Sequence, residues 1–206
     1  MKTSSLLAIG TASLIFTVGA GAQNAPTTKP AASSATAAPT KPKPFAPADT
    51  RIYITIAEAM QFQLKASEKL RGKMNDGDPE LVVFAAKIGR DVTELYTPGV
   101  TLAQERGVPG AVDKKTKTGT IPTDITAADK AALARVDSMN KDDKKWLVAY
   151  FDLFAKESKK GAAEADKGAK AAQDADLKAW AEKVAALLKT QTEEIEAKHK
   201  ALKSKK

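Results

Sequence analysis

The chain has 206 residues, no cysteine and a formal net charge of +8. Without cysteine it forms no disulfide, no cysteine-ligated zinc site and no thiol nucleophile, and it carries no cysteine for a lipid anchor. Lysines before residue 44 and after residue 197 account for the positive charge, so residues 44–197 are close to neutral. A nucleic-acid-binding protein usually has a basic face on its fold with clustered arginines, and this pattern is absent here. We therefore expect no nucleic-acid partner.

The first 22 residues have the pattern of a secretory signal peptide. Lys2 gives a positive start, Leu6 to Val18 form an apolar run, and Ala20-Gly21-Ala22 ends it. Small residues at this spacing predict cleavage between Ala22 and Gln23. The run is too short to span a membrane, which needs about 20 apolar residues. The sequence thus predicts an exported protein, periplasmic or extracellular, that is not transmembrane after processing; association with the outer membrane stays open.

Residues 23–48 have the composition of a linker. They contain six of the ten prolines, separated by Ala, Thr, Ser and Lys. Such a segment buries too little apolar surface to offset the entropy of ordering it, so we expect a disordered linker. It is either a spacer through an envelope layer or a plain unstructured leader. The folded domain is expected at residues 49–203.

Apolar residues at helical spacing predict two long helices in the first half of this domain. The first is expected from Asp49 to Met74. Asp78-Pro79 opens the second, with Asp as the N-cap and Pro at the first helical position. Pro98-Gly99 predicts a kink or break in it, and Gly107 with Pro109 ends it. The apolar positions are Tyr53, Ala57, Met60 and Leu64 in the first helix, and Leu81, Phe84, Ile88, Val92 and Leu95 in the second.

A polar segment, Gly110 to Asp124, separates these helices from the rest. It is too long for a tight turn, and we expect a mobile surface crossover. Thr126 then caps a short third helix, with Asp129 at the N3 position. The apolar residues of that helix are Leu133, Val136 and Met139.

Two further long helices complete the chain. Asp142 or Asp143 is expected to cap a fourth helix of about thirty residues, and Asp174 to cap a fifth. The apolar positions of the fourth helix change from bulky residues to alanine along its length, which indicates close approach of a neighbouring helix or weaker packing there. They are Leu147, Tyr150, Phe151 and Phe154, then Ala162, Ala165, Ala169 and Ala172.

The expected class is all-α, with four long helices around one core and a short helix in the crossover. The long link before Thr126 favours one crossover connection, as ferritin-like bundles have. Periodicity alone does not decide the helix directions.

Three groups of residues carry a family resemblance. They are Asp78-Pro79 followed by Phe84, Asp91 and Gly107-Val108; Trp146 to Tyr150; and Asp174 to Ala181, which reads D-A-D-L-K-A-W-A. Together they resemble the secreted bacterial family called domain of unknown function 4142, over most of residues 50–203. The resemblance implies a ferritin-like helical bundle and an envelope location. It implies no activity, because the family has none established.

The chain departs from the family at three histidine positions, and it has Trp146-Leu147 where the family tends to have Phe-Asp. Members of the family usually have a histidine directly after the residue that matches Asp91, and this chain has Val92 there. Two further histidines are usual on the last two long helices, where this chain has Ser158 and Gln191. The missing histidines argue against a metal-binding role for this member.

Glu196 and His199 are the only candidates for metal ligands. They form an E-x-x-H pair, half of a di-iron carboxylate site. The full site needs a second such pair, and His199 is the only histidine. An exposed surface pair is therefore the favoured interpretation, and we expect no metal and no cofactor.

Ser158 and Gln191 interrupt the apolar positions of their helices. One interpretation is a small polar pocket inside the bundle, with Asp91, Glu94 or Glu157 nearby. The favoured alternative is a pair of buried groups hydrogen-bonded to each other or to backbone carbonyls.

Residues 198–206 form a basic C-terminal tail that could bind an anionic envelope surface. The alternative is a solvated end that aids solubility. The lysines concerned are Lys198, Lys200, Lys203, Lys205 and Lys206.

We find no G-x-S-x-G turn and no glycine-rich phosphate loop in the sequence, so we expect no enzyme. The sequence is best interpreted as an exported, non-enzymatic binding or structural protein of the cell envelope. The alternative is a ferritin-like metal or small-ligand binding protein with a degenerate site.

Overall fold

The computed structural model describes residues 42–74, 77–110, 121–140 and 144–204. These residues belong to one unit of the chain. The predicted signal peptide with its cleavage site at Ala22 and Gln23, and the alternative caps Asp142 and Asp143, lie outside the described residues. They stay predictions.

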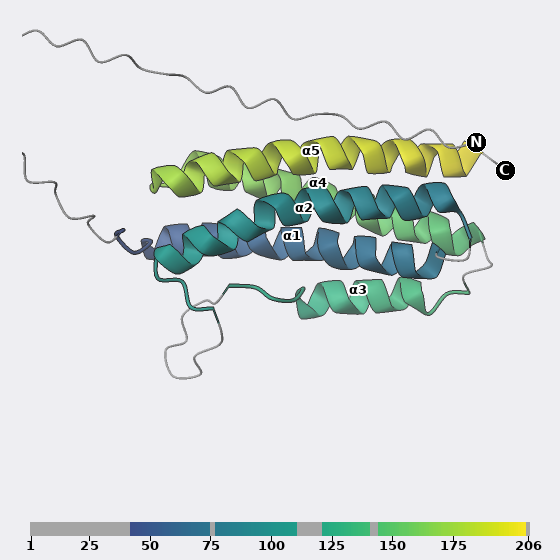
Figure 1. The fold of residues 1–206 in the computed structure, drawn as a ribbon. Helices are drawn as coiled ribbons and strands as arrows, with labels where there is room; N and C mark the ends of the chain where they lie inside the picture. Colours follow the sequence, from purple (N-terminus) through teal and green to yellow (C-terminus); the bar gives the residue numbers. More distant parts are fainter. Residues whose placement is uncertain (1–41, 75–76, 111–120, 141–143, 205–206) are drawn as a thin grey trace, which may run out of the picture. The chain divides into compact units, whose positions relative to one another are not determined.

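The described residues form five α-helices and no strand (Figure 1). This confirms the predicted all-α bundle of four long helices with a short one in the connection. No described helix has the length and apolar character needed to cross a membrane. The helices are α1 (Pro47–Met74), α2 (Pro79–Glu105), α3 (Ala127–Asp137), α4 (Lys144–Ala171) and α5 (Ala175–Ser204).

Each long helix packs against two antiparallel neighbours. The helix α1 contacts α2 and α4, and α5 contacts the same two. Asp49 at the start of α1 meets Gln173 just after α4, and Trp180 near the start of α5 meets Leu95 of α2. Consequently α2 and α4 run in the same direction, and the connection that contains α3 crosses the length of the bundle (Figure 1). This confirms the single crossover; the ferritin-like relationship stays a prediction.

Three helix starts have the predicted caps. The side chain of Asp78 accepts from the backbone N–H of Glu80 at 2.9 Å. Thr126 accepts from the N–H of Asp129 at 3.2 Å, and Asp174 accepts from that of Leu177 at 3.0 Å. Each cap satisfies a backbone donor that the first helical turn leaves unpaired.

The predicted linker, residues 23–48, is wrong at its C-terminal end. Phe45 is half-buried, its backbone N–H donates to the Arg106 carbonyl at 3.0 Å, and its ring lies 6.5 Å from that of Tyr53. The helix α1 then begins at Pro47, two residues before the predicted Asp49. An aromatic side chain near the bundle end gains more by burial than a polar linker residue would.

Pro98 does not end α2, which continues to Glu105. In Figure 1 the second half of α2 runs at an angle to the first. Of the predicted kink or break at Pro98-Gly99, the kink is therefore correct. The indole N–H of Trp180 donates to the Leu95 carbonyl at 2.9 Å. A Cβ on Gly99 would lie 2.5 Å from the Trp180 ring. The tryptophan thus packs directly on the backbone beside the proline and gives a carbonyl at the kink a donor.

The predicted mobile crossover is also wrong over its last residues. Ile121 and Ile125 are buried. The Pro122 carbonyl accepts from the Tyr96 hydroxyl and from the Gln61 amide. Residues 111–120 of this segment lie outside the described part of the chain.

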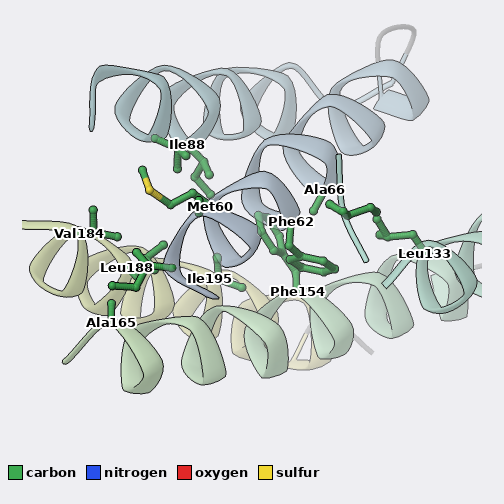
Figure 2. Close-up of a cluster of buried hydrophobic side chains, with 14 of the residues drawn as sticks. Met60, Phe62, Ala66, Ile88, Leu133, Phe154, Ala165, Val184, Leu188 and Ile195 are labelled. Carbon is green, nitrogen blue, oxygen red and sulfur yellow. The ribbon is translucent and has the colours of Figure 1, made fainter. Parts of the chain in front are cut away.

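The core contains the aromatic residues of α4. Trp146, Tyr150, Phe151 and Phe154 are at most 1% exposed. Figure 2 shows side chains from the four long helices pointing toward one another around Met60, with Phe154 beside them. These aromatic residues are therefore part of the core.

Glycines bring the alanine-rich half of α4 close to α1. A Cβ on Gly161 would lie 2.9 Å from that of Ala59, and one on Gly168 would lie 2.9 Å from Ile52. Such distances are shorter than packed carbon atoms tolerate. Of the two predicted alternatives, the close approach of a neighbouring helix is the correct one.

Candidate functional site

The two predicted metal-ligand candidates, Glu196 and His199, have different surroundings in the structure. The Nε2 atom of His199 lies 3.1 Å from Oδ1 of Asp152 on α4. The Glu196 side chain is exposed. Within the described residues, no group of three or more His, Cys, Asp or Glu side chains could hold a metal ion. His199 is placed to pair with Asp152 between α4 and α5 instead.

Much of the predicted basic tail is the last part of α5. Within it, Lys198 pairs with Glu80 of α2 and Lys203 pairs with Asp152, each at 3.4 Å. Lys200 is exposed, and Lys205 and Lys206 lie outside the described residues. The helix continues because the apolar positions of α5 extend to Leu202, which packs against the core.

Ser158 and Gln191 are both fully buried, and each bonds to a backbone carbonyl. Ser158 donates to the Phe154 carbonyl at 2.6 Å and accepts from Nε2 of Gln63 at 2.7 Å. Gln191 donates to the Ile88 carbonyl at 3.4 Å. The favoured alternative, bonding to backbone carbonyls, is confirmed. Sequence reasoning missed Gln63, although it follows Met60 by three residues and so lies on the same face of α1.

These polar residues lie at one level of the bundle. Gly161 of α4 sits against Ala59 of α1 and Leu188 of α5. Moving one helical turn along the bundle from that contact, toward the C-terminal ends of α1 and α5 and the N-terminal end of α4, reaches three polar residues. They are Gln63 on α1, Ser158 on α4 and Gln191 on α5. We call these three residues the polar layer. The amide oxygens of Gln63 and Gln191 are buried and have no hydrogen-bond partner among the described residues. Two buried acceptors without donors are an unusual feature in a packed core.

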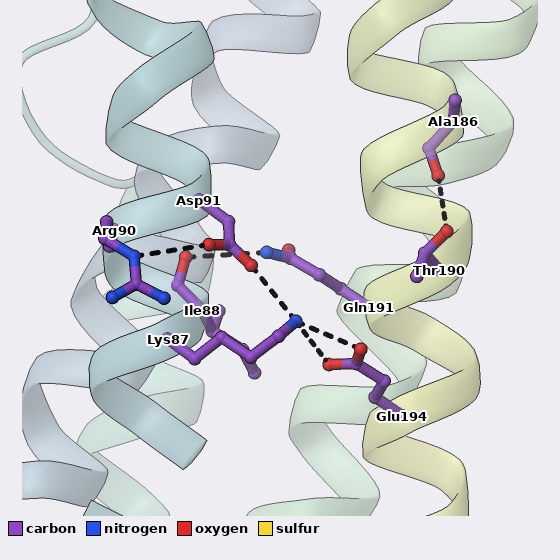
Figure 3. A network of polar contacts seen from close by, with 8 residues as sticks. All are labelled: Lys87, Ile88, Arg90, Asp91, Ala186, Thr190, Gln191 and Glu194. Atoms are coloured by element: carbon purple, nitrogen blue, oxygen red, sulfur yellow. Dashed lines mark hydrogen bonds and ion pairs between the residues drawn. The ribbon is translucent and has the colours of Figure 1, made fainter. Parts of the chain in front are cut away.

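A charged network closes the surface between α2 and α5 beside the polar layer (Figure 3). Nζ of Lys87 lies 2.9 Å from Oε2 of Glu194 and 3.1 Å from Oδ2 of Asp91. The hydrogen bond with Glu194 is the main cause that raises the pKa of Lys87, and Asp91 adds to it. Arg90 lies 3.6 Å from Asp91 on the outer side. The network joins α2 to α5, and both carboxylate oxygens of Asp91 face basic side chains within it.

The predicted interior carboxylates are not inside the bundle. Asp91 belongs to the surface network, and Glu94 is exposed. Glu157 pairs with Lys160 on its own helix at 3.6 Å. The polar pocket with Asp91, Glu94 or Glu157 is therefore wrong: Glu94 is exposed to water, and the partly buried Asp91 and Glu157 each pair with a lysine instead.

A small acidic pocket of about 80 Å³ lies where α1, α4 and the start of α3 meet. Glu58, Asp129, Glu157 and Glu164 line it together with Lys160. Burial raises the pKa of Glu58, the charge of Asp129 raises it further, and Lys160 opposes both. No sequence pattern pointed to this pocket, because its carboxylates come from distant segments.

The described helices define a helical-bundle protein whose interior consists mainly of packed hydrophobic side chains. A protein-family model described as a domain of unknown function (DUF4142) matches residues 31–197. The chain belongs to this family, which confirms the predicted resemblance. No curated protein matches the chain significantly, and no solved structure does.

Proposed function

We propose that this is an exported, non-enzymatic protein of the cell envelope that acts by binding through the faces of its helices. The observation that carries the proposal is the use of the interior polar groups: Ser158 and Gln191 bond to backbone carbonyls. Gln63 also donates to Ser158 between α1 and α4, and the Gln191 bond to Ile88 joins α5 to α2, so these groups bond within the bundle and the surface is left for interaction. The signal-peptide pattern of the first 22 residues supports export. Mass spectrometry of exported protein should find Gln23 at the N-terminus; a chain that begins at Met1 contradicts cleavage.

The partner surface that we propose is anionic, and the contact is the end of α5. Within the described residues, Lys198 and Lys203 already have carboxylate partners, whereas Lys200 is exposed. Lys205 and Lys206 add two positive charges after it. Lysines near an anionic surface contribute about 1 kcal/mol each, reduced by salt.

Co-sedimentation with vesicles tests this contact. Replacing Lys200, Lys205 and Lys206 by glutamine should weaken binding to vesicles with anionic lipids and leave the fold intact. A matched control replaces three exposed lysines elsewhere on α5: Lys178, Lys183 and Lys189. Equal losses in both variants contradict a specific contact, and so does equal binding to neutral vesicles.

A second candidate, a small ligand inside the bundle, is favoured by one observation. The amide oxygens of Gln63 and Gln191 are buried, with no donor from residues 42–74, 77–110, 121–140 or 144–204, and a ligand with N–H or O–H groups would supply donors. Elemental analysis and native mass spectrometry of protein purified without chelator test this candidate. A stoichiometric metal or small molecule favours it over the envelope-binding proposal.

A further inference from the structure

A groove of about 670 Å³ runs along the outer face of α1 and α2. Its floor consists of small or apolar side chains, among them Leu64, Ala85 and Gly89. The groove lies on the face where α1 and α2 contact each other, away from α4 and α5. At its centre a Cβ on Gly89 would lie 3.1 Å from Oγ of Ser67, so these two residues mark the same level.

The exposed side of α2 that borders this groove has a regular spacing, which continues one turn beyond the lining residues to Val83. Val83, Ala86, Arg90 and Thr93 follow one another at intervals of three and four residues, so they share one face of the helix. All four are exposed. Val83 is the large hydrophobic residue that stands out in the described part of the chain, at 69% exposed. This spacing is the one with which helices pair side by side.

Two acidic and two basic residues line the groove, Glu68, Glu94, Arg71 and Arg90, and of these Glu68 and Arg90 lie at its centre, next to Ser67 and Gly89. Glu68 follows Ser67 on α1, and Arg90 follows Gly89 on α2; both line the groove and are exposed. Because the helices are antiparallel and rise about 1.5 Å per residue, the two charges lie within about 3 Å of the same level, on opposite sides of the groove.

This arrangement is self-complementary. A two-fold axis in the plane of contact, parallel to the groove, places α1 of one copy over α2 of the other. Glu68 of each copy then faces Arg90 of its partner, and the interface contains this ion pair twice. The same operation makes each α1 antiparallel to the α2 that it covers, as neighbouring helices are within the bundle.

Both charges are free to change partners. Glu68 now pairs with Lys65 at 3.2 Å on its own helix. Arg90 lies 3.6 Å from its neighbour Asp91 and remains 68% exposed. Exposed pairs of this kind contribute little to stability. We propose that the α1–α2 groove is the interface of a symmetric homodimer, in which Glu68 and Arg90 pair across the two-fold axis. The dimer does not depend on the envelope binding proposed above.

Charge reversal tests this interface in the purified chain. The wild type should show a concentration-dependent monomer–dimer equilibrium at low salt by sedimentation equilibrium. Glu68→Arg puts two arginines opposite each other, and Arg90→Glu puts two glutamates opposite each other. Each variant should dimerise at least about tenfold more weakly than the wild type, because facing like charges repel.

The two single variants give the sharpest result when they are mixed. In a mixed dimer, the arginine introduced at position 68 of one chain faces the glutamate introduced at position 90 of the other. The native Arg90 of the first chain faces the native Glu68 of the second, so both ion pairs form. The mixture should therefore dimerise more tightly than either variant alone, and the double variant Glu68→Arg/Arg90→Glu should recover self-association.

Lys178→Glu, on the exposed surface of α5, is the control for net charge and should leave dimerisation unchanged. Circular dichroism checks that every variant is folded. A wild type that stays monomeric over the accessible concentration range overturns the proposal, as does a mixture that fails to associate.

Discussion

At the scale of single residues, the buried side chains of the polar layer place unpaired polar atoms inside the bundle. Gln191 is completely buried, yet its amide oxygen has no partner in the part of the chain that the structure describes, and its N–H bond to the Ile88 carbonyl is long, at 3.4 Å. Leaving a buried acceptor unpaired costs about 1–3 kcal/mol, more than one weak hydrogen bond returns. The residue therefore costs stability in the absence of a donor.

Gln191→Leu should raise the free energy of unfolding by about 1 kcal/mol, because leucine fills a similar volume and removes the unpaired oxygen. Urea unfolding followed by circular dichroism measures this change. Gln191→Ala is the control for volume and should be about 2 kcal/mol less stable than the leucine variant, since it leaves a cavity. If Gln191→Leu proves clearly destabilising, the amide has a bound donor, which favours the ligand alternative.

Glu58 makes the stability depend on pH. Its pKa is higher in the folded protein than in the unfolded chain, because burial and Asp129 disfavour its charge. The folded state thus holds the proton more tightly, and stability is lost as the pH rises through this pKa.

Glu58→Gln should therefore be more stable than the wild type at pH 7, by up to about 0.5 kcal/mol. The gain should vanish near pH 3, where Glu58 is protonated in both states. Thermal unfolding at several pH values measures the difference. Glu182→Gln on the exposed surface of α5 corrects for the loss of one negative charge. A gain that does not change with pH contradicts this account.

At the scale of elements, contacts between helices override local signals. Pro98 is a strong helix breaker, yet α2 continues past it to Glu105. Trp180 packs on Gly99 and bonds to the Leu95 carbonyl, so the kinked segment gains contacts from α5. The same role makes Gly99 intolerant of any side chain.

Gly99→Ala should lower the free energy of unfolding by about 1–3 kcal/mol, because the new methyl group overlaps the Trp180 ring. Gly72→Ala is the matched control: it lies in α1 with nothing within 4 Å of its added Cβ. That substitution should stabilise by about 0.5–1 kcal/mol, since alanine favours the helix. Equal effects at both sites would show that the Trp180 contact is unimportant.

At the scale of the molecule, most charged side chains of the described residues lie at the surface around a packed core, with Asp49 as a buried exception that accepts from the backbone N–H groups of Gln173 and Asp174. Most ion pairs in the described part of the chain involve exposed side chains, for example Lys170 with Asp166, where the two are 75% and 60% exposed. Such pairs are screened by salt and contribute little to folding. Charge should therefore affect association more than stability.

We expect the free energy of unfolding to change by less than about 1 kcal/mol between low and high salt. The proposed dimer should weaken strongly over the same range, because its two ion pairs face each other across the interface. Chemical unfolding and sedimentation measured in the same buffers separate the two effects. A large loss of stability in salt would mean that ion pairs hold the bundle together.

Local sequence patterns determined the helices, the starts of α2, α3 and α5, and the family. Caps such as Asp78 and Asp174, and apolar residues at helical spacing, act within a few residues of the chain and can be predicted from it. The aromatic core of α4 was equally visible, because Tyr150 and Phe154 repeat with the helical period.

Only the tertiary structure decided which distant residues meet. The polar layer combines Gln63, Ser158 and Gln191 from three helices, and the Glu58 pocket joins carboxylates from distant segments. The continuation of α2 past Pro98 depends on Trp180, which is far away in the chain. Helical period fixes the face on which a residue lies, but the level at which two helices meet is set by packing across the whole bundle.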